Sequence, residues 1–93
     1  MSSRILLHEL TRTEIGAVAA EALLILPTGA VEQHGPHLPV GTDYVVVEHV
    51  ARAAAVAVVG QIPVVVAPAL PFGSSHHHLP FGGTMSLSTA LYY

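Results

Sequence analysis

The chain has 93 residues, of which 52% are hydrophobic and only 10% are charged, whereas a small free-standing domain usually carries about 25% charged residues. The net charge of -3, with three arginines and no lysine, excludes the cation clusters that nucleic acids and anionic membrane surfaces require. The absence of cysteine excludes disulfides and thiolate sites, so any metal must be held by His, Asp and Glu, which suits zinc or manganese.

The surplus of apolar residues has two interpretations. One small domain has too little interior to bury so many of them. Either the chain buries surface against other chains, or it is a portion of a larger domain.

The first predicted elements are a helix over residues 8–22 and a strand over residues 22–29. Thr11 with Glu14 three residues later is a capping-box pattern, and alanine and glutamate dominate the rest of the helix. The strand is a short, continuous apolar run that ends in proline and glycine. Such a run is typical of a strand buried on both faces of a parallel sheet.

The same order of elements then repeats. Residues 42–60 predict a helix closed by Gly60, although the YVVV within it also suits a strand, and residues 62–70 predict a second buried strand. A loop over residues 71–86 follows, and Ser88 is a candidate N-cap for the start of another helix. Buried strands that alternate with helices indicate a parallel α/β sheet.

Two segments bear on localisation. The apolar run near the N-terminus has only three residues and acidic residues follow it, which is unlike a secretory signal. The uncharged stretch from Ala53 past Leu79 has the length of a membrane span, but Gly60 and three prolines interrupt it. We therefore expect a soluble, cytoplasmic protein.

The segment EQHGPHLPVGTD follows the first predicted strand, and ligands of open α/β sheets bind beyond the C-terminal ends of strands. Glu32 and His34 share one side of an extended segment, and the glycines and prolines shape a loop that returns Asp43 to them. One imidazole and two carboxylates are a candidate divalent-metal site. Alternatively, these residues are polar because the loop is solvated. His37, at odd spacing from His34, is predicted to be structural or to support a ligand.

Two motifs, LPTGAVEQHGPHLPVGTD and FGSSHHHLPFGGTMSLS, resemble the signatures of the creatininase family, the creatinine amidohydrolases and their relatives. The resemblance covers nearly the whole chain, and the motifs occur in family order. It implies a three-layer parallel-sheet α/β fold, represented here by its N-terminal strands and helices. It also implies that Glu32, His34 and Asp43 bind a centre of two zinc or manganese ions, with Asp43 bridging the ions.

The second motif implies a substrate site. In the family its serine lies at the substrate, which points to Ser75 here, and its histidine corresponds to His78. A loop histidine that only shapes the pocket is the alternative for His78. His77 stands where relatives often have an acidic residue, so its contribution is left open.

The implied activity is hydrolysis of a C–N bond in a small, often cyclic, amide. Family members are longer, however, and supply an H-x-E pair of metal ligands from a later strand, a pattern that is absent after residue 84. We therefore expect residues 1–93 to be the incomplete N-terminal part of a single creatininase-like domain. The family also implies a homo-oligomer, often a hexamer, or else a second chain that completes the site. The alternative function is a non-catalytic metal-binding or interaction module.

Overall fold

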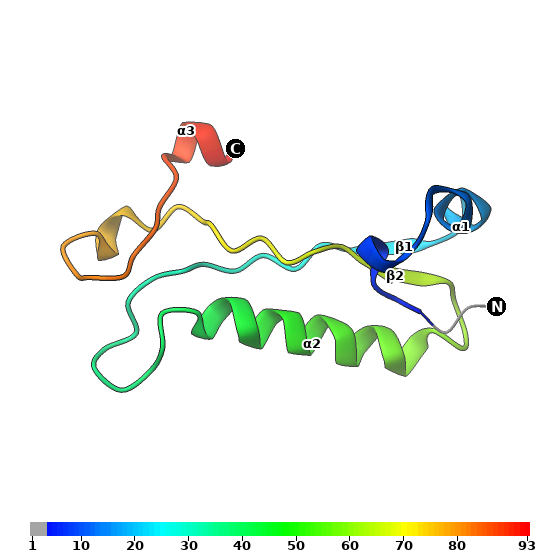
Figure 1. Ribbon diagram of the computed structural model, residues 1–93, viewed down its shortest axis with the longest axis horizontal. Coiled ribbons are helices and arrows are strands. Elements are labelled where there is room, and N and C mark those ends of the chain that lie inside the picture. The colour runs from blue at the N-terminus through cyan, green and yellow to red at the C-terminus, as the bar shows by residue number, and fades with distance from the viewer. Residues whose placement is uncertain (1–3) are drawn as a thin grey trace. The chain divides into compact units, whose positions relative to one another are not determined.

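The computed structural model describes residues 4–93 (Figure 1). These residues divide into two compact units. The strand unit comprises residues 4–27 and 49–68, and the loop unit comprises residues 28–48 and 69–93. Helix α2, Thr42–Val58, contributes residues to both units. It confirms the predicted helix over residues 42–60, except that residues 59 and 60 form a turn.

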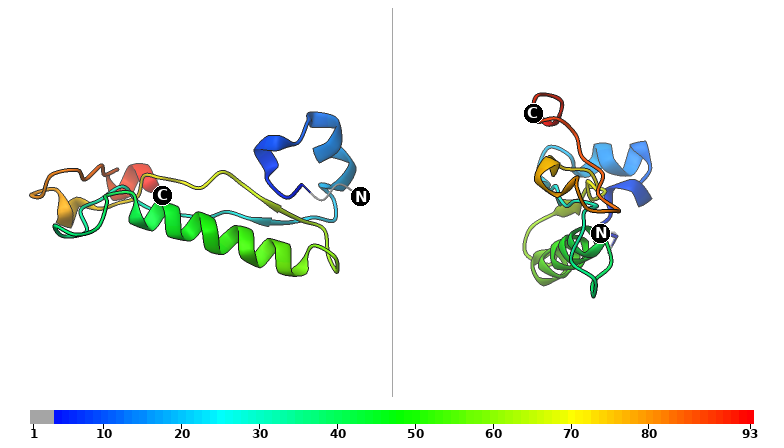
Figure 2. Two further views of the ribbon diagram at one scale, coloured as in Figure 1. Left: turned by 60° about the horizontal axis from the view of Figure 1, so that its bottom comes forward. Right: turned by 90° about the vertical axis from the view of Figure 1, so that its left-hand side faces the viewer.

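The strand unit is built on a parallel strand pair. Strands β1, Leu23–Ile25, and β2, Val64–Val66, lie side by side, with Leu23 opposite Val64 (Figure 2). This pairing confirms the predicted parallel arrangement. Against the other side of β2, Leu6 forms a parallel bridge to Val66. The core of the unit combines this strand with one face of α2, and its buried members are Ile5, Ala51, Ala55, Val64 and Val66.

The predicted helix over residues 8–22 is shorter than expected. A 3₁₀ turn, η1, covers Leu7–Glu9, and helix α1 covers Arg12–Val18. The predicted capping box is confirmed, since the Glu14 backbone N–H donates to Thr11 Oγ1 while the Thr11 N–H donates to the Glu14 carboxylate. This cap fixes the start of α1 and leaves residues 8–11 outside the helix. Helix α1 ends at Val18 because the chain turns there to enter β1.

The two strands differ in burial. All three residues of β2 are buried, as predicted. The prediction for β1 was wrong, because Leu23 and Leu24 are 52% and 55% exposed. Within residues 4–93 the sheet has two strands, so β1 pairs through one edge, whereas β2 is also covered by residue 6 and by the alanines of α2.

In the loop unit, backbone hydrogen bonds hold the segments that leave the two strands together. Thr28 bridges Leu70 in parallel, and the Gly29 N–H donates to the Leu70 carbonyl at 2.8 Å. Further along, Val31 bridges Met85. These bonds place the loop after β1 beside the loop after β2.

Two short helical elements complete the loop unit. The 3₁₀ turn η2 covers His76–His78, and helix α3 covers Thr89–Tyr92. The predicted N-cap is confirmed, because Ser88 Oγ accepts from the Leu91 N–H. No helix within residues 4–93 is both long and apolar enough to span a membrane.

Candidate metal centre

The first turn of α2 approaches the loop after β1 very closely, which brings Asp43 to the other candidate ligands. A Cβ atom on Gly29 would lie 2.9 Å from Tyr44 Cα, a distance that side chains do not tolerate. Only glycine therefore permits this approach. Asp43 lies in the first turn of α2, where a carboxylate is favoured by the unpaired N–H groups of the helix.

The three residues predicted as metal ligands meet in the loop unit. Glu32, His34 and Asp43 are partly buried, and each offers one ligand atom within 4.8 Å of the others. His34 Nε2 lies 3.1 Å from Asp43 Oδ1. The folded chain therefore assembles, over 12 residues, the donor set of one imidazole and two carboxylates.

The hydrogen bonds of His34 define which ring nitrogen is free. Nδ1 lies 3.2 Å from the Glu32 backbone carbonyl, which can only accept, so Nδ1 carries a proton. In the neutral ring, Nε2 then presents a lone pair toward the Asp43 carboxylate. Two lone pairs at this distance repel unless a cation, either a proton or a metal ion, lies between them. The donor set therefore fits a divalent metal.

The contacts of His34 and Glu32 also shift the pKa values of these two residues. The hydrogen bond to the Glu32 carbonyl and then the charge of Asp43 raise the pKa of His34, against the effect of burial. A hydrogen bond from Ser75 lowers the pKa of the Glu32 carboxyl, and Asp43 and His78 act in the same direction while burial opposes them. Glu32 is thus held as a carboxylate, the form that binds metal.

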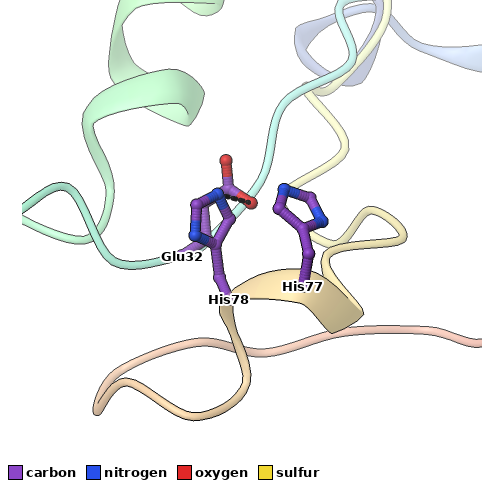
Figure 3. A group of neighbouring side chains, drawn as sticks. All are labelled: Glu32, His77 and His78. Atoms are coloured by element: carbon purple, nitrogen blue, oxygen red, sulfur yellow. Dashed lines mark ion pairs between the residues drawn. The ribbon is translucent and has the colours of Figure 1, made fainter.

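A second group of ligand types surrounds the same carboxylate. Figure 3 shows His77 and His78, both from η2, facing Glu32. His78 Nε2 lies 3.8 Å from Glu32 Oε2, and one ligand atom of each residue lies within 4.8 Å of the others. The rings of His77 and His78 are tilted at 45° with centroids 4.0 Å apart. Glu32 is therefore common to two groups of three ligands.

Gln33 links the two loops and was missed by the sequence analysis. Its backbone N–H donates to Thr84 Oγ1 at 3.1 Å, and its side-chain Nε2 lies 2.7 Å from His78 Nδ1. Its Oε1 accepts from the Gly35 N–H, which orients the amide so that Nε2 donates to His78. The signal was present in the sequence, since period-two alternation points Gln33 away from Glu32 and His34, toward another segment.

The remaining predicted residues occupy different surroundings. Ser75 is only 3% exposed, and its hydroxyl acts on Glu32. His78 is partly buried between Gln33 and Glu32. His37 is exposed. Contact of Ser75 or His78 with a substrate stays a prediction, as does the supporting role of His37.

Comparison with known proteins identifies what this arrangement is similar to. Residues 8–93 match the model of a family described as creatininase, creatinine amidohydrolase. A mycofactocin precursor peptide peptidase of Mycobacterium tuberculosis is 34% identical over 88 residues, which are 82% of this chain and 35% of that protein.

Solved structures agree with the sequence match. A tryptophan-to-phenylalanine mutant creatininase superposes with a TM-score of 0.80 at 33% identity, covering 95% of this chain and 36% of that one. A glutamate-to-glutamine mutant creatininase of the Zn-Zn type gives a TM-score of 0.74 at 33% identity, covering 97% and 36%. The chain thus spans about a third of the length of the relatives it matches.

Proposed function

The chain belongs to the creatininase family, and we propose on that premise that it contributes the metal ligands of an amide-cleaving hydrolase. The fold is the α/β fold of creatininase structures. Relatives named creatinine amidohydrolase and peptide peptidase both have names that denote cleavage of a C–N bond. The proposed substrate is therefore a small molecule with an amide bond, cyclic or linear.

The observation that carries this proposal is the pair formed by His34 and Asp43. An imidazole lone pair and a carboxylate oxygen lie 3.1 Å apart, and the ring is held in that state by a backbone carbonyl. Such a pair favours a cation between its atoms. With Glu32 it supplies three protein ligands, a number found in catalytic zinc sites, and a Zn-Zn relative supports zinc as the metal.

The chain's own residues have distinct roles in this proposal. Glu32, His34 and Asp43 would hold one ion, and in the complete two-ion site of the family Asp43 would bridge it to a second ion. Ser75 keeps Glu32 ionised through its hydrogen bond. A divalent ion bound there would supply the Lewis acidity that polarises an amide carbonyl. Ser75 and His78 are proposed to contact the substrate beside them.

A non-catalytic metal-binding or interaction module is the second candidate function. The observation that favours it is the exposure of large apolar side chains on β1 and α2, such as Leu24 at 55%, Val45 at 63% and Val56 at 65%. Apolar surface of this kind is covered by partner chains in many assemblies. A homo-oligomer or a completing chain, in the cytoplasm, is our proposal for that partner.

The proposed function is tested by metal content and amide hydrolysis measured together. The purified chain should retain at least about one zinc or manganese ion by plasma mass spectrometry, with its assembly size taken from light scattering. Asp43→Ala should lose the metal and any hydrolysis of creatinine or short peptides together. His8→Ala is the control, because it removes an exposed histidine of the strand unit that has no proposed role in metal binding. Full hydrolysis by the Asp43→Ala protein would refute the proposal, and bound metal without any hydrolysis would favour the module.

A further inference from the structure

The group formed by Glu32, His77 and His78 is not used by the proposed function as a metal site. All three residues belong to the loop unit, and their ligand atoms lie within 4.8 Å of one another. His77 and His78 are adjacent in a 3₁₀ turn, yet both rings face the same carboxylate (Figure 3). His76, the third member of the turn, is directed elsewhere, with Nδ1 2.7 Å from Ser86 Oγ.

We propose that Glu32, His77 and His78 form a second divalent-cation site that shares the Glu32 carboxylate with the site of His34 and Asp43. The carboxylate has two oxygens, and Oε2 is the one that faces His78 at 3.8 Å. Carboxylates commonly bridge paired metal ions that lie about 3.5–4 Å apart. The second site needs no residue of the first other than Glu32, so the two sites can be tested separately.

The donor set selects the metal. Two imidazoles and one carboxylate are the protein ligands of a catalytic zinc site in which the fourth position stays open. Nitrogen-rich sets favour zinc, cobalt and nickel, whereas carboxylate-rich sets also accept manganese. The second site should therefore take zinc and reject manganese, while the first site, with two carboxylates and one imidazole, accepts both.

The ligand atoms of Glu32, His77 and His78 must move closer to one another when the metal binds. In a tetrahedral zinc site with bonds of about 2.1 Å, neighbouring ligand atoms lie about 3.4 Å apart. His78 Nε2 and Glu32 Oε2 are already 3.8 Å apart. His77 is exposed and belongs to a short turn, so its side chain is free to close the remaining distance.

Gln33 sets the affinity of the second site. In the structure its amide Nε2 donates to His78 Nδ1, so the proton of the neutral ring is on Nε2, the atom that the metal needs. Binding moves that proton to Nδ1, which must then donate. The Gln33 amide therefore has to turn over and give up its bond with the Gly35 N–H. A carboxylate at this position would accept from both groups at once without turning.

The first test is stoichiometry. Equilibrium dialysis should give two zinc ions per chain but one manganese ion. His77→Ala should bind one zinc ion, and His77→Gln, which preserves side-chain length, should do the same. Asp43→Asn should also bind one, through the second site alone. His76→Ala, in the same turn but outside the group, should still bind two.

Several outcomes would overturn the second site. They are one zinc ion in the unchanged chain, two zinc ions in both His77 variants, or loss of a zinc ion in the His76 variant. Failure of the proposed function looks different, because Asp43→Asn would then leave zinc binding unchanged while His77→Ala still removed an ion.

The second test uses Gln33 and does not depend on removing a ligand. Gln33→Glu should tighten the second zinc site by at least about tenfold, in line with the effect of groups that orient metal-bound histidines. Gln33→Leu should weaken it by a similar factor. A titration with cobalt, whose visible absorption reports its ligands, should show the change in the second equivalent only. Equal affinities in all three proteins would overturn the role of Gln33 and the ligand assignment of His78.

Discussion

The loops that follow β1 and β2 each bring a histidine to a carboxylate, and the two histidines are in opposite tautomeric states. His34 donates from Nδ1 to a backbone carbonyl, which leaves Nε2 free toward Asp43. His78 accepts at Nδ1 from the Gln33 amide, which leaves a proton on Nε2 toward Glu32. A backbone carbonyl cannot turn over, whereas a side-chain amide can. The histidine of the first loop therefore keeps its Nε2 lone pair available for a cation. The histidine of the second loop can bind one only after the Gln33 amide has rotated.

The largest effect is expected from the residue that the two loops share. Glu32→Gln should weaken zinc binding at both sites by about 100-fold, because a neutral amide replaces the carboxylate that both sites share. Isothermal titration measures both affinities. Glu21→Gln, an exposed acidic residue before β1, is the control and should bind as before. Loss at one site alone would show that Glu32 serves only one loop.

The approach of α2 to the first loop can be tested at Gly29. Gly29→Ala should cost about 1–3 kcal/mol in the free energy of unfolding, since the added methyl group meets backbone atoms of Tyr44. It should also weaken the first zinc site by displacing Asp43, while the His77 site keeps its affinity.

Gly16→Ala is the matched control for that experiment. Gly16 lies within α1, and an added Cβ meets nothing within 4 Å. The change should raise the free energy of unfolding by about 1 kcal/mol, through helix propensity. Denaturant unfolding measures both variants. Equal effects of the two substitutions would mean that the close approach of α2 to Gly29 is unimportant.

The fixed hydrogen bond of His34 predicts that stability and zinc affinity both depend on pH. The raised pKa of His34 means that protonation stabilises the metal-free chain, fully below the pKa of an unfolded histidine. That contribution is lost as the pH rises above 6.5 through the raised pKa. Zinc affinity should change in the opposite direction and increase over the same range, because the metal displaces the proton.

Thermal unfolding at a series of pH values, first in a chelator and then with zinc, measures the slope of stability against pH without and with the metal. In His34→Gln, the part of each slope above the unfolded histidine pKa should disappear. Slopes of the same sign with and without zinc would contradict the assigned tautomer of His34.

The smallest effect is expected where the two loops are tied together. Thr84→Val removes the hydroxyl that accepts from the Gln33 N–H and should cost about 1 kcal/mol. Thr84→Ser keeps the hydroxyl and should be close to neutral. Hydrogen exchange at the Gln33 amide, faster in the valine variant alone, is the measurement. Unchanged exchange would mean that the loops hold each other through other bonds.

Local signals were reliable in the sequence, and long-range ones were not. Thr11 and Ser88 cap helices through neighbours three residues away, so their roles follow from spacing. Glu32, His34 and Asp43 were grouped from one loop, and the structure brings them together. The exposure of Leu23 depends on what lies beside an edge, and the meeting of Gln33 with His78 spans 45 residues. The alternation of side chains points Gln33 away from its neighbours but does not identify His78 as its partner, and the apolar run of residues 22–29 does not predict that Leu23 is exposed.

The 3₁₀ geometry of η2 also bears on how such a loop can change during evolution. The turn holds three consecutive histidines, of which His77 and His78 face Glu32 while His76 contacts Ser86. A one-residue insertion ahead of the turn would put His76 and His77 where His77 and His78 now stand. Because the three residues are identical, such an insertion would still leave two histidines beside Glu32. In a turn with two different ligands, the same insertion would remove one of them.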